Sequence, residues 1–161
     1  MTPMKEQVIL VDEQDNPIGL MPKLEAHQKA VLHRAFSVFI LNAKGELMLQ
    51  QRAKHKYHSP GLWTNTCCSH QRQGETNVQA GMRRLREEMG FTTELKEIIS
   101  FIYKAPFDNG LTEHEFDHVL IGHYEDSPII NLNVTTQTYV VRKDRVATDD
   151  AIMGDMAIGH H

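Results

Sequence analysis

A strongly apolar segment, residues 35 to 41 (AFSVFIL), gives the clearest strand signal in the chain. Turn residues follow at 42 to 45 (NAKG), and residues 46 to 52 then alternate between polar and apolar side chains. Two such segments joined by a short turn that contains glycine predict a β-hairpin. An earlier apolar run, residues 8 to 11, predicts a shorter strand that ends at the turn residues 15 to 17 (DNP).

One amphipathic helix is expected downstream of this hairpin. It should begin near Thr76 or Asn77 and end at Gly90, a residue type that commonly terminates helices. Four apolar residues at positions i, i+4, i+7 and i+11 would share one face of this helix and face the core: Val78, Met82, Leu85 and Met89.

Further strands are expected at residues 98 to 103 and 115 to 124, separated by turn residues. The order of strands, helix and strands predicts an α+β protein. From about residue 131 the sequence has no clear amphipathic period, apart from a possible strand at residues 138 to 141.

Length and composition restrict the class of protein. A chain of 161 residues, 40% hydrophobic and 24% charged, is typical of a single globular domain. Its net charge of −4 gives no reason to expect nucleic acid as a partner. The only two cysteines are neighbours, which argues against a disulfide framework and favours a reducing cytosol. The first residues have neither the apolar length of a membrane span nor that of a signal peptide.

Histidine and acidic residues suggest a metal site. His27 and His33 lie before the main apolar strand, at its entry, and His70 follows the cysteines. Glu113 and Glu115 alternate in an expected strand, so both carboxylates would lie on one face. Three imidazoles and two carboxylates are suitable ligands for Mg²⁺, Mn²⁺ or Zn²⁺, although any one such histidine is more often a surface or core residue.

Residues 67 to 70 (CCSH) allow several interpretations. Cys68 and His70 are two residues apart and would share a face of an extended segment. They could line a metal or substrate site, form a nucleophile and base, or leave the thiol as a general acid or base. A buried, inert thiol is the simplest alternative.

The helix carries acidic side chains that could bind Mg²⁺ together with a phosphate ligand, Glu87 and Glu88. The spacing of Arg83 and Glu87 at i, i+4 equally predicts a solvated, salt-bridged face, and spacing alone favours that interpretation.

Residues 69 to 91 also resemble a known motif. They read S-x5-E-x7-R-R-L-x-E-E-x-G-F, which is similar to the Nudix box, G-x5-E-x7-R-E-U-x-E-E-x-G-U with U an aliphatic residue. Ser69 replaces the first glycine, and Arg84 replaces a glutamate that Nudix hydrolases use to bind metal. The second departure argues against diphosphate hydrolysis.

Together with LHRAFSVFI, PGLWTNTCCSH, RRLREEMG and EHEFDHV, this altered box closely resembles the type I isopentenyl-diphosphate Δ-isomerases, over roughly residues 5 to 128. The resemblance implies a Nudix-type α/β/α sandwich with a mixed sheet at residues 1 to 130, followed by an atypical tail at 131 to 161. It implies interconversion of isopentenyl and dimethylallyl diphosphate in isoprenoid biosynthesis. The expected substrate is a prenyl diphosphate, with no nucleic-acid or membrane partner. The expected protein is cytoplasmic, a monomer or a homodimer.

The resemblance also assigns residues. The catalytic groups would be Cys68, Glu115 and Tyr103. A tightly bound divalent metal (Mn²⁺, Mg²⁺ or Zn²⁺) would have three histidine and two glutamate ligands: His27, His33, His70, Glu113 and Glu115. A Mg²⁺ ion that accompanies the diphosphate would bind Glu88 and the carbonyl of Cys68. The diphosphate itself would be held by Lys23, Arg52, Lys56 and Ser69.

One feature of the family is absent from this sequence. Its members usually end in a helical segment with a tryptophan whose π face lies against a cationic intermediate. The only tryptophan here is Trp63, so either Tyr139 takes that place or the altered tail impairs activity. A Nudix diphosphohydrolase and a silent metal or diphosphate-binding protein are the alternative functions.

Overall fold

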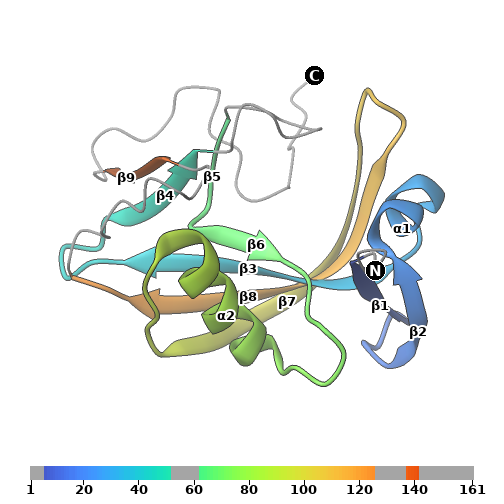
Figure 1. Cartoon of the computed structure of the whole chain (residues 1–161), viewed down its shortest axis with the longest axis horizontal. Helices are drawn as coiled ribbons and strands as arrows, with labels where there is room; N and C mark the ends of the chain where they lie inside the picture. The colour runs from blue at the N-terminus through green and yellow to red at the C-terminus, as the bar shows by residue number, and fades with distance from the viewer. Residues whose placement is uncertain (1–5, 52–61, 126–136, 142–161) are drawn as a thin grey trace, which may run out of the picture.

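The structure is a computed structural model that describes residues 6–51, 62–125 and 137–141 (Figure 1). The described residues form two helices and nine strands, and neither helix has the length and apolar character that a membrane span requires. In chain order the elements are β1 (Gln7–Val11), β2 (Pro17–Pro22), α1 (Lys23–Lys29), β3 (His33–Leu41), β4 (Leu47–Gln51), β5 (Trp63–Thr64), β6 (Cys67–Ser69), α2 (Asn77–Met89), β7 (Leu95–Pro106), β8 (Thr112–His123) and β9 (Gln137–Val141).

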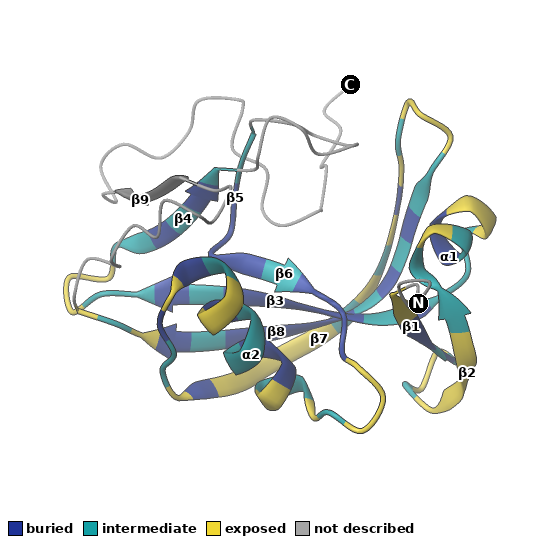
Figure 2. Cartoon of the chain, in the orientation of Figure 1, coloured by how far each residue is buried: buried dark blue, intermediate teal, exposed yellow. Residues whose placement is uncertain are grey.

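Strand β3 organises the sheet. Strand β8 runs parallel to it from the pair His33–Glu115 to the pair Leu41–His123. Strands β1, β6 and β4 pair antiparallel with successive parts of β3, and β7 pairs antiparallel with β8. In Figure 2 the middle of β3 and β8 is mostly buried, whereas β7 is largely exposed. The predicted α+β class and mixed sheet are confirmed.

Helix α2 has the boundaries that the sequence predicts. The Thr76 side chain accepts a hydrogen bond from the backbone of Gln79, and the Gln79 side chain accepts one from the backbone of Thr76. This reciprocal capping box fixes the first turn. At the other end Gly90 adopts a left-handed φ of 77°, which costs glycine little.

The apolar face of α2 packs on one face of the sheet. Leu85 and Met89 are buried, and Val78 and Met82 pack against the same core, so the predicted stripe is confirmed. Gly81 lets the helix approach closely, because a Cβ at this position would lie 2.6 Å from a methyl group of Leu120. The buried core consists of Phe36, Val38, Ile40, Met48, Cys67, Ala80, Leu85, Met89, Phe91, Leu95 and Leu120.

The predicted hairpin of β3 and β4 is confirmed in its strands, its turn and the antiparallel pair next to the turn, but the strands diverge beyond that pair. The two strands share one pair, Leu41–Leu47, and β4 then pairs with β5 and β9. The Thr66 hydroxyl separates them, because it accepts from the backbone N–H of Ile40 at 2.9 Å and donates to the carbonyl of Met48 at 2.7 Å. One side chain therefore replaces ladder hydrogen bonds between the diverging strands.

Four elements were not predicted: β2, α1 and the short strands β5 and β6. Residues 17 to 22, which follow the predicted turn directly, form the mostly exposed strand β2. The turn itself is closed by Asp12, whose carboxylate accepts the backbone N–H groups of Gln14 and Asn16. Helix α1 has only seven residues, too few to show a helical period. The expected strand near residue 138 is confirmed as β9, which pairs with β4. The division of the chain at residue 130 stays a prediction.

Candidate metal centre and active site

Three histidines and one glutamate from four separate elements meet in one place. His27 comes from α1, His33 begins β3, His70 follows β6, and Glu115 lies in β8. One ligand atom from each lies within 4.8 Å of the others, and all four residues are buried. The nitrogens that face Glu115 are Nε2 in every case, at 4.0 Å, 3.4 Å and 3.1 Å respectively.

Backbone carbonyls orient two of these imidazoles. Nδ1 of His27 lies 2.7 Å from the carbonyl oxygen of Lys23, and Nδ1 of His33 lies 2.8 Å from that of Val31. A carbonyl can only accept, so each Nδ1 carries the hydrogen and each Nε2 presents a lone pair to the centre. This arrangement is the one that metal-binding histidines usually have.

Burial sets the charge of these groups. Desolvation lowers the pKa of His27, and it lowers the pKa of His70 to about 4, with a further contribution from the charge of Lys23. Burial alone would raise the pKa of Glu115, but its contacts with the imidazoles of His33 and His70 hold that pKa well below its usual range. Neutral imidazoles and an ionised carboxylate are the forms that bind metal.

This donor set fits a divalent metal ion. Ligands about 2.1 Å from an ion lie at most about 4.2 Å apart, so a small contraction of the four groups would bring them to bonding distance. Three imidazoles and a carboxylate are better ligands for Zn²⁺ or Mn²⁺ than for an ion such as Ca²⁺, which prefers oxygen ligands. The residues that would hold the metal are therefore His27, His33, His70 and Glu115.

Tyr103 connects the two glutamates of β8. Its hydroxyl lies 2.7 Å from Oε2 of Glu115 and 3.1 Å from Oε2 of Glu113. Glu113 is fully buried on the same face of β8, but it is not one of the four residues whose ligand atoms converge. Its assignment as a metal ligand stays a prediction.

The two cysteines of β6 face opposite sides of the sheet. Cys67 is fully buried in the core, and burial raises the pKa of its thiol to about 12. Cys68 is half-buried and pairs with Ser37, which alternates with His33 along β3 and shares its face. Cys68 therefore leaves the sheet on the face of the metal centre, and the inert thiol is Cys67.

The predicted diphosphate ligands are placed only in part. Lys23 begins α1, and its backbone carbonyl contacts Nδ1 of His27, so it lies beside the centre. Ser69 is buried on the face of β6 opposite Cys68. Arg52 and Lys56 lie outside the described residues.

Glu88 has protein partners in α2 and β4. It accepts a hydrogen bond from the Gln50 side chain at 3.0 Å and forms an ion pair with Arg84. Arg84 also lies 2.8 Å from Glu87. The residue that replaces a glutamate of the Nudix box thus sits between the two remaining acidic side chains.

Comparison with known proteins assigns the chain to a family. The NUDIX domain model matches residues 31–150. An isopentenyl-diphosphate Delta-isomerase 2 of Aromatoleum aromaticum is 55% identical over 128 residues, covering 80% of this chain and 68% of the relative. Its namesake from Photorhabdus laumondii is 56% identical, with 81% and 73% covered. The chain belongs to the type I isopentenyl-diphosphate Δ-isomerases of the Nudix family.

Solved structures agree on the fold. A crystallised protein of Deinococcus radiodurans superimposes with a TM-score of 0.71 at 23% identity, covering 93% of this chain and 94% of that one. The MutT protein of Methanosarcina mazei gives 0.53 at 18% identity, covering 68% and 76%. At these identities the likeness concerns the Nudix fold alone.

Arg83 has a structural role in this isomerase-family chain that sequence reasoning did not predict. It forms two hydrogen bonds with Glu75, at 2.6 Å and 2.9 Å, and a third at 3.4 Å with the carbonyl oxygen of His70. It thereby fixes the loop that carries one of the metal ligands to α2. The sequence feature that could have indicated this role is the position of Arg83 in the Nudix box.

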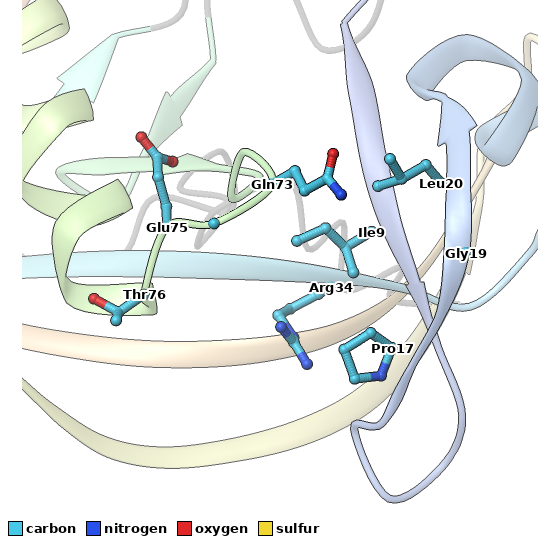
Figure 3. Close-up of a pocket in the computed structure, with 9 residues that line it drawn as sticks. Ile9, Pro17, Gly19, Leu20, Arg34, Gln73, Glu75 and Thr76 are labelled. Atoms are coloured by element: carbon cyan, nitrogen blue, oxygen red, sulfur yellow. The ribbon is translucent and has the colours of Figure 1, made fainter.

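A cavity of about 430 Å³ lies between β1, β2 and the loop before α2 (Figure 3). Its lining contains none of the four converging ligands, so it is separate from the metal centre. The lining residues are Ile9, Pro17, Gly19, Leu20, Arg34, Gln73, Gly74, Glu75 and Thr76.

Proposed function

We propose that this chain interconverts isopentenyl diphosphate and dimethylallyl diphosphate in isoprenoid biosynthesis. The observation that carries the proposal is the buried set of three histidines and Glu115, with the Tyr103 hydroxyl on the same carboxylate. Relatives more than 50% identical over four fifths of the chain, named as isopentenyl-diphosphate Delta-isomerases, support it.

The reaction needs an acid and a base on an unactivated hydrocarbon. Moving the double bond from C3–C4 to C2–C3 adds a proton to C4 and removes one from C2, with a cation at C3 in between. The two proton-transfer groups must flank the alkene, and water must be excluded so that the cation is not captured. Buried residues beside a half-buried thiol meet these requirements.

Glu115 and Cys68 are the groups that we assign to proton transfer. They belong to β8 and β6 and leave the same face of the sheet. Tyr103 donates to Glu115 and helps to hold or relay its proton. A divalent metal on the four donors would supply positive charge that fixes the Glu115 carboxylate and acidifies a proton it carries.

The diphosphate would bind remote from the reacting carbons and supply binding energy for orientation. We assign it to Lys23, Arg52, Lys56 and Ser69, together with a Mg²⁺ ion at Glu88 and the Cys68 carbonyl. Mg²⁺ usually binds one or two carboxylates and completes its shell with substrate phosphate oxygens and water.

We also propose Glu113 as a fifth ligand, since it is buried on the same face of β8 and contacts the Tyr103 hydroxyl that also contacts Glu115. Mn²⁺, Mg²⁺ and Zn²⁺ are the candidate ions of the buried site. The adjacent cysteines form no disulfide, which suits work in the cytosol as a monomer or homodimer.

The test is direct. The purified chain, loaded with Mn²⁺ and supplied with Mg²⁺, is incubated with radiolabelled isopentenyl diphosphate, and the acid-labile allylic product is counted. Formation of dimethylallyl diphosphate is the expected result. Its absence from folded, metal-loaded protein would overturn the proposal, and release of phosphate instead would identify a diphosphohydrolase.

A further inference from the structure

The three histidines of the metal centre differ in what their outer nitrogens contact. Nδ1 of His27 and Nδ1 of His33 each face a backbone carbonyl, at 2.7 Å and 2.8 Å. Nδ1 of His70 is buried, and none of the residues that the structure describes forms a hydrogen bond with it. Because metal-bound imidazoles almost always donate this second N–H to a carboxylate, carbonyl or water, His70 requires an outer partner.

Asp117 is a buried carboxylate on the face of the sheet that carries the metal centre. In β8 the acidic residues Glu113, Glu115 and Asp117 alternate, so all three leave the same face. Asp117 is only 1% exposed. It is not among the four residues whose ligand atoms converge, which places it outside the inner ligands.

The strand register puts Asp117 and His70 in one cross-strand row. Asp117 pairs with Ala35, and the pairing of β3 with β6, continued one residue beyond Ser69, places His70 on the other side of Ala35. The Gln71 side chain donates to the carbonyl of Ala35 at 3.3 Å and keeps this segment beside β3. Two strand spacings separate the Cα atoms by roughly 10 Å, and only a methyl group lies between them.

We propose that Asp117 accepts the Nδ1 hydrogen of His70, directly or through one bridging water, and so positions His70 for metal binding. A carboxylate in this place fixes the tautomer that presents the Nε2 lone pair to the centre. Its negative charge also strengthens the imidazole as a ligand. Asp117 is then a positioning residue, since it acts on the metal through His70. The inference rests on the metal centre of the proposed function but not on the reaction.

The test measures metal binding without substrate. Metal-free full-length chain is titrated with Mn²⁺, and free Mn²⁺ is read from its EPR signal. Asp117→Leu, close to aspartate in size, removes both the acceptor and the charge, and should weaken Mn²⁺ binding by about 10- to 100-fold. Asp117→Asn keeps an acceptor oxygen but loses the charge, and should weaken it measurably, by about 3- to 10-fold.

The matched control is the next residue of the strand. His118 is equally buried but faces the other side, where it contacts Glu97 at 2.7 Å and Asp15 at 3.2 Å. His118→Gln should lower the melting temperature of the metal-free chain and leave the Mn²⁺ affinity within about twofold of the unaltered chain.

Three results would overturn the inference. The first is a folded Asp117→Leu chain whose Mn²⁺ affinity is unchanged. If this variant does not fold, an unchanged Mn²⁺ affinity in Asp117→Asn would overturn the inference instead. The second is equal weakening by Asp117→Leu and His118→Gln, which would indicate general loosening of β8. The third is no Mn²⁺ binding by the unaltered chain. A chain that binds Mn²⁺ as described but forms no dimethylallyl diphosphate would overturn only the proposed reaction.

Discussion

The two adjacent cysteines should react with alkylating agents at very different rates. Cys67 has no exposed surface, and burial raises the pKa of its thiol from 9.0 to about 12. The reacting species is the thiolate. At pH 8 a thiol with a pKa of about 12 is roughly 0.01% ionised, about a thousandfold less than a thiol with a pKa of 9. Cys68 is half-buried and faces away from the core, so it should be modified first.

The assay is alkylation of the folded chain with one equivalent of iodoacetamide at pH 8. Fragment-ion mass spectrometry of the peptide that carries both residues locates the adduct. We expect modification of Cys68 alone, loss of isomerase activity in step with it, and protection by isopentenyl diphosphate. In the matched variants, Cys68→Ala should abolish turnover, whereas Cys67→Ala should retain it with a loss of stability of about 1 kcal/mol from the small cavity.

Comparable labelling of both cysteines in the folded chain would refute the burial argument. Equal loss of turnover from Cys67→Ala and Cys68→Ala, with both variants folded, would refute the assignment of the thiol. The two failures are separable, because labelling reports on access and ionisation whereas turnover reports on chemistry.

Three further predictions follow from the same contacts. Tyr103→Phe removes a hydrogen bond to the charged Glu115 that is worth about 1.5–3 kcal/mol, so kcat should fall by about 10- to 150-fold with little change in KM. A fall below about threefold in steady-state assays would contradict the role of Tyr103 in proton transfer. Burial lowers the pKa of His70 to about 4, so its contribution to stability is complete above about pH 6.5 and is lost as pH falls toward 4. Urea denaturation of the metal-free chain should show a loss of up to about 3 kcal/mol in the free energy of unfolding over this interval, and a flat profile would contradict the prediction. Gly81→Ala places a Cβ 2.6 Å from Leu120, and the overpacking cost of about 1–3 kcal/mol should outweigh a helix-propensity gain of about 1 kcal/mol. Thermal melting should therefore show a lower melting temperature, and an equal or higher one would contradict the prediction.

The parts of the fold that the sequence predicted are those set by local signals. Helix α2 was predicted to within a residue, because Thr76 and Gly90 mark its ends by capping chemistry that needs no distant partner. The divergence of β4 from β3 was not predicted, because it depends on Thr66, which lies 18 residues beyond Met48 and forms its hydrogen bonds only in the folded chain. Helix α1 was missed because seven residues are too few for a periodic pattern.

The metal centre also combines features that the sequence predicted with features that depend on long-range contacts. Its ligands are 88 residues apart along the chain, from His27 to Glu115, and their spacing alone did not distinguish them from surface histidines. The resemblance to a family supplied the assignment, and the register of β3 with β8 explains it, since it sets His33 directly beside Glu115. Asp117 carried the same alternating signal as Glu113 and Glu115, but a carboxylate without a family role attracted no prediction.

The substitution of Arg84 for a Nudix glutamate has a further consequence for the second metal. Its guanidinium contacts both Glu87 and Glu88, so it offsets the negative charge that would attract Mg²⁺ to the helix. A diphosphate brings additional negative charge and its own Mg²⁺, and can bind Arg84 while the metal binds Glu88. We therefore expect Arg84 to make Mg²⁺ binding at Glu88 depend on the diphosphate.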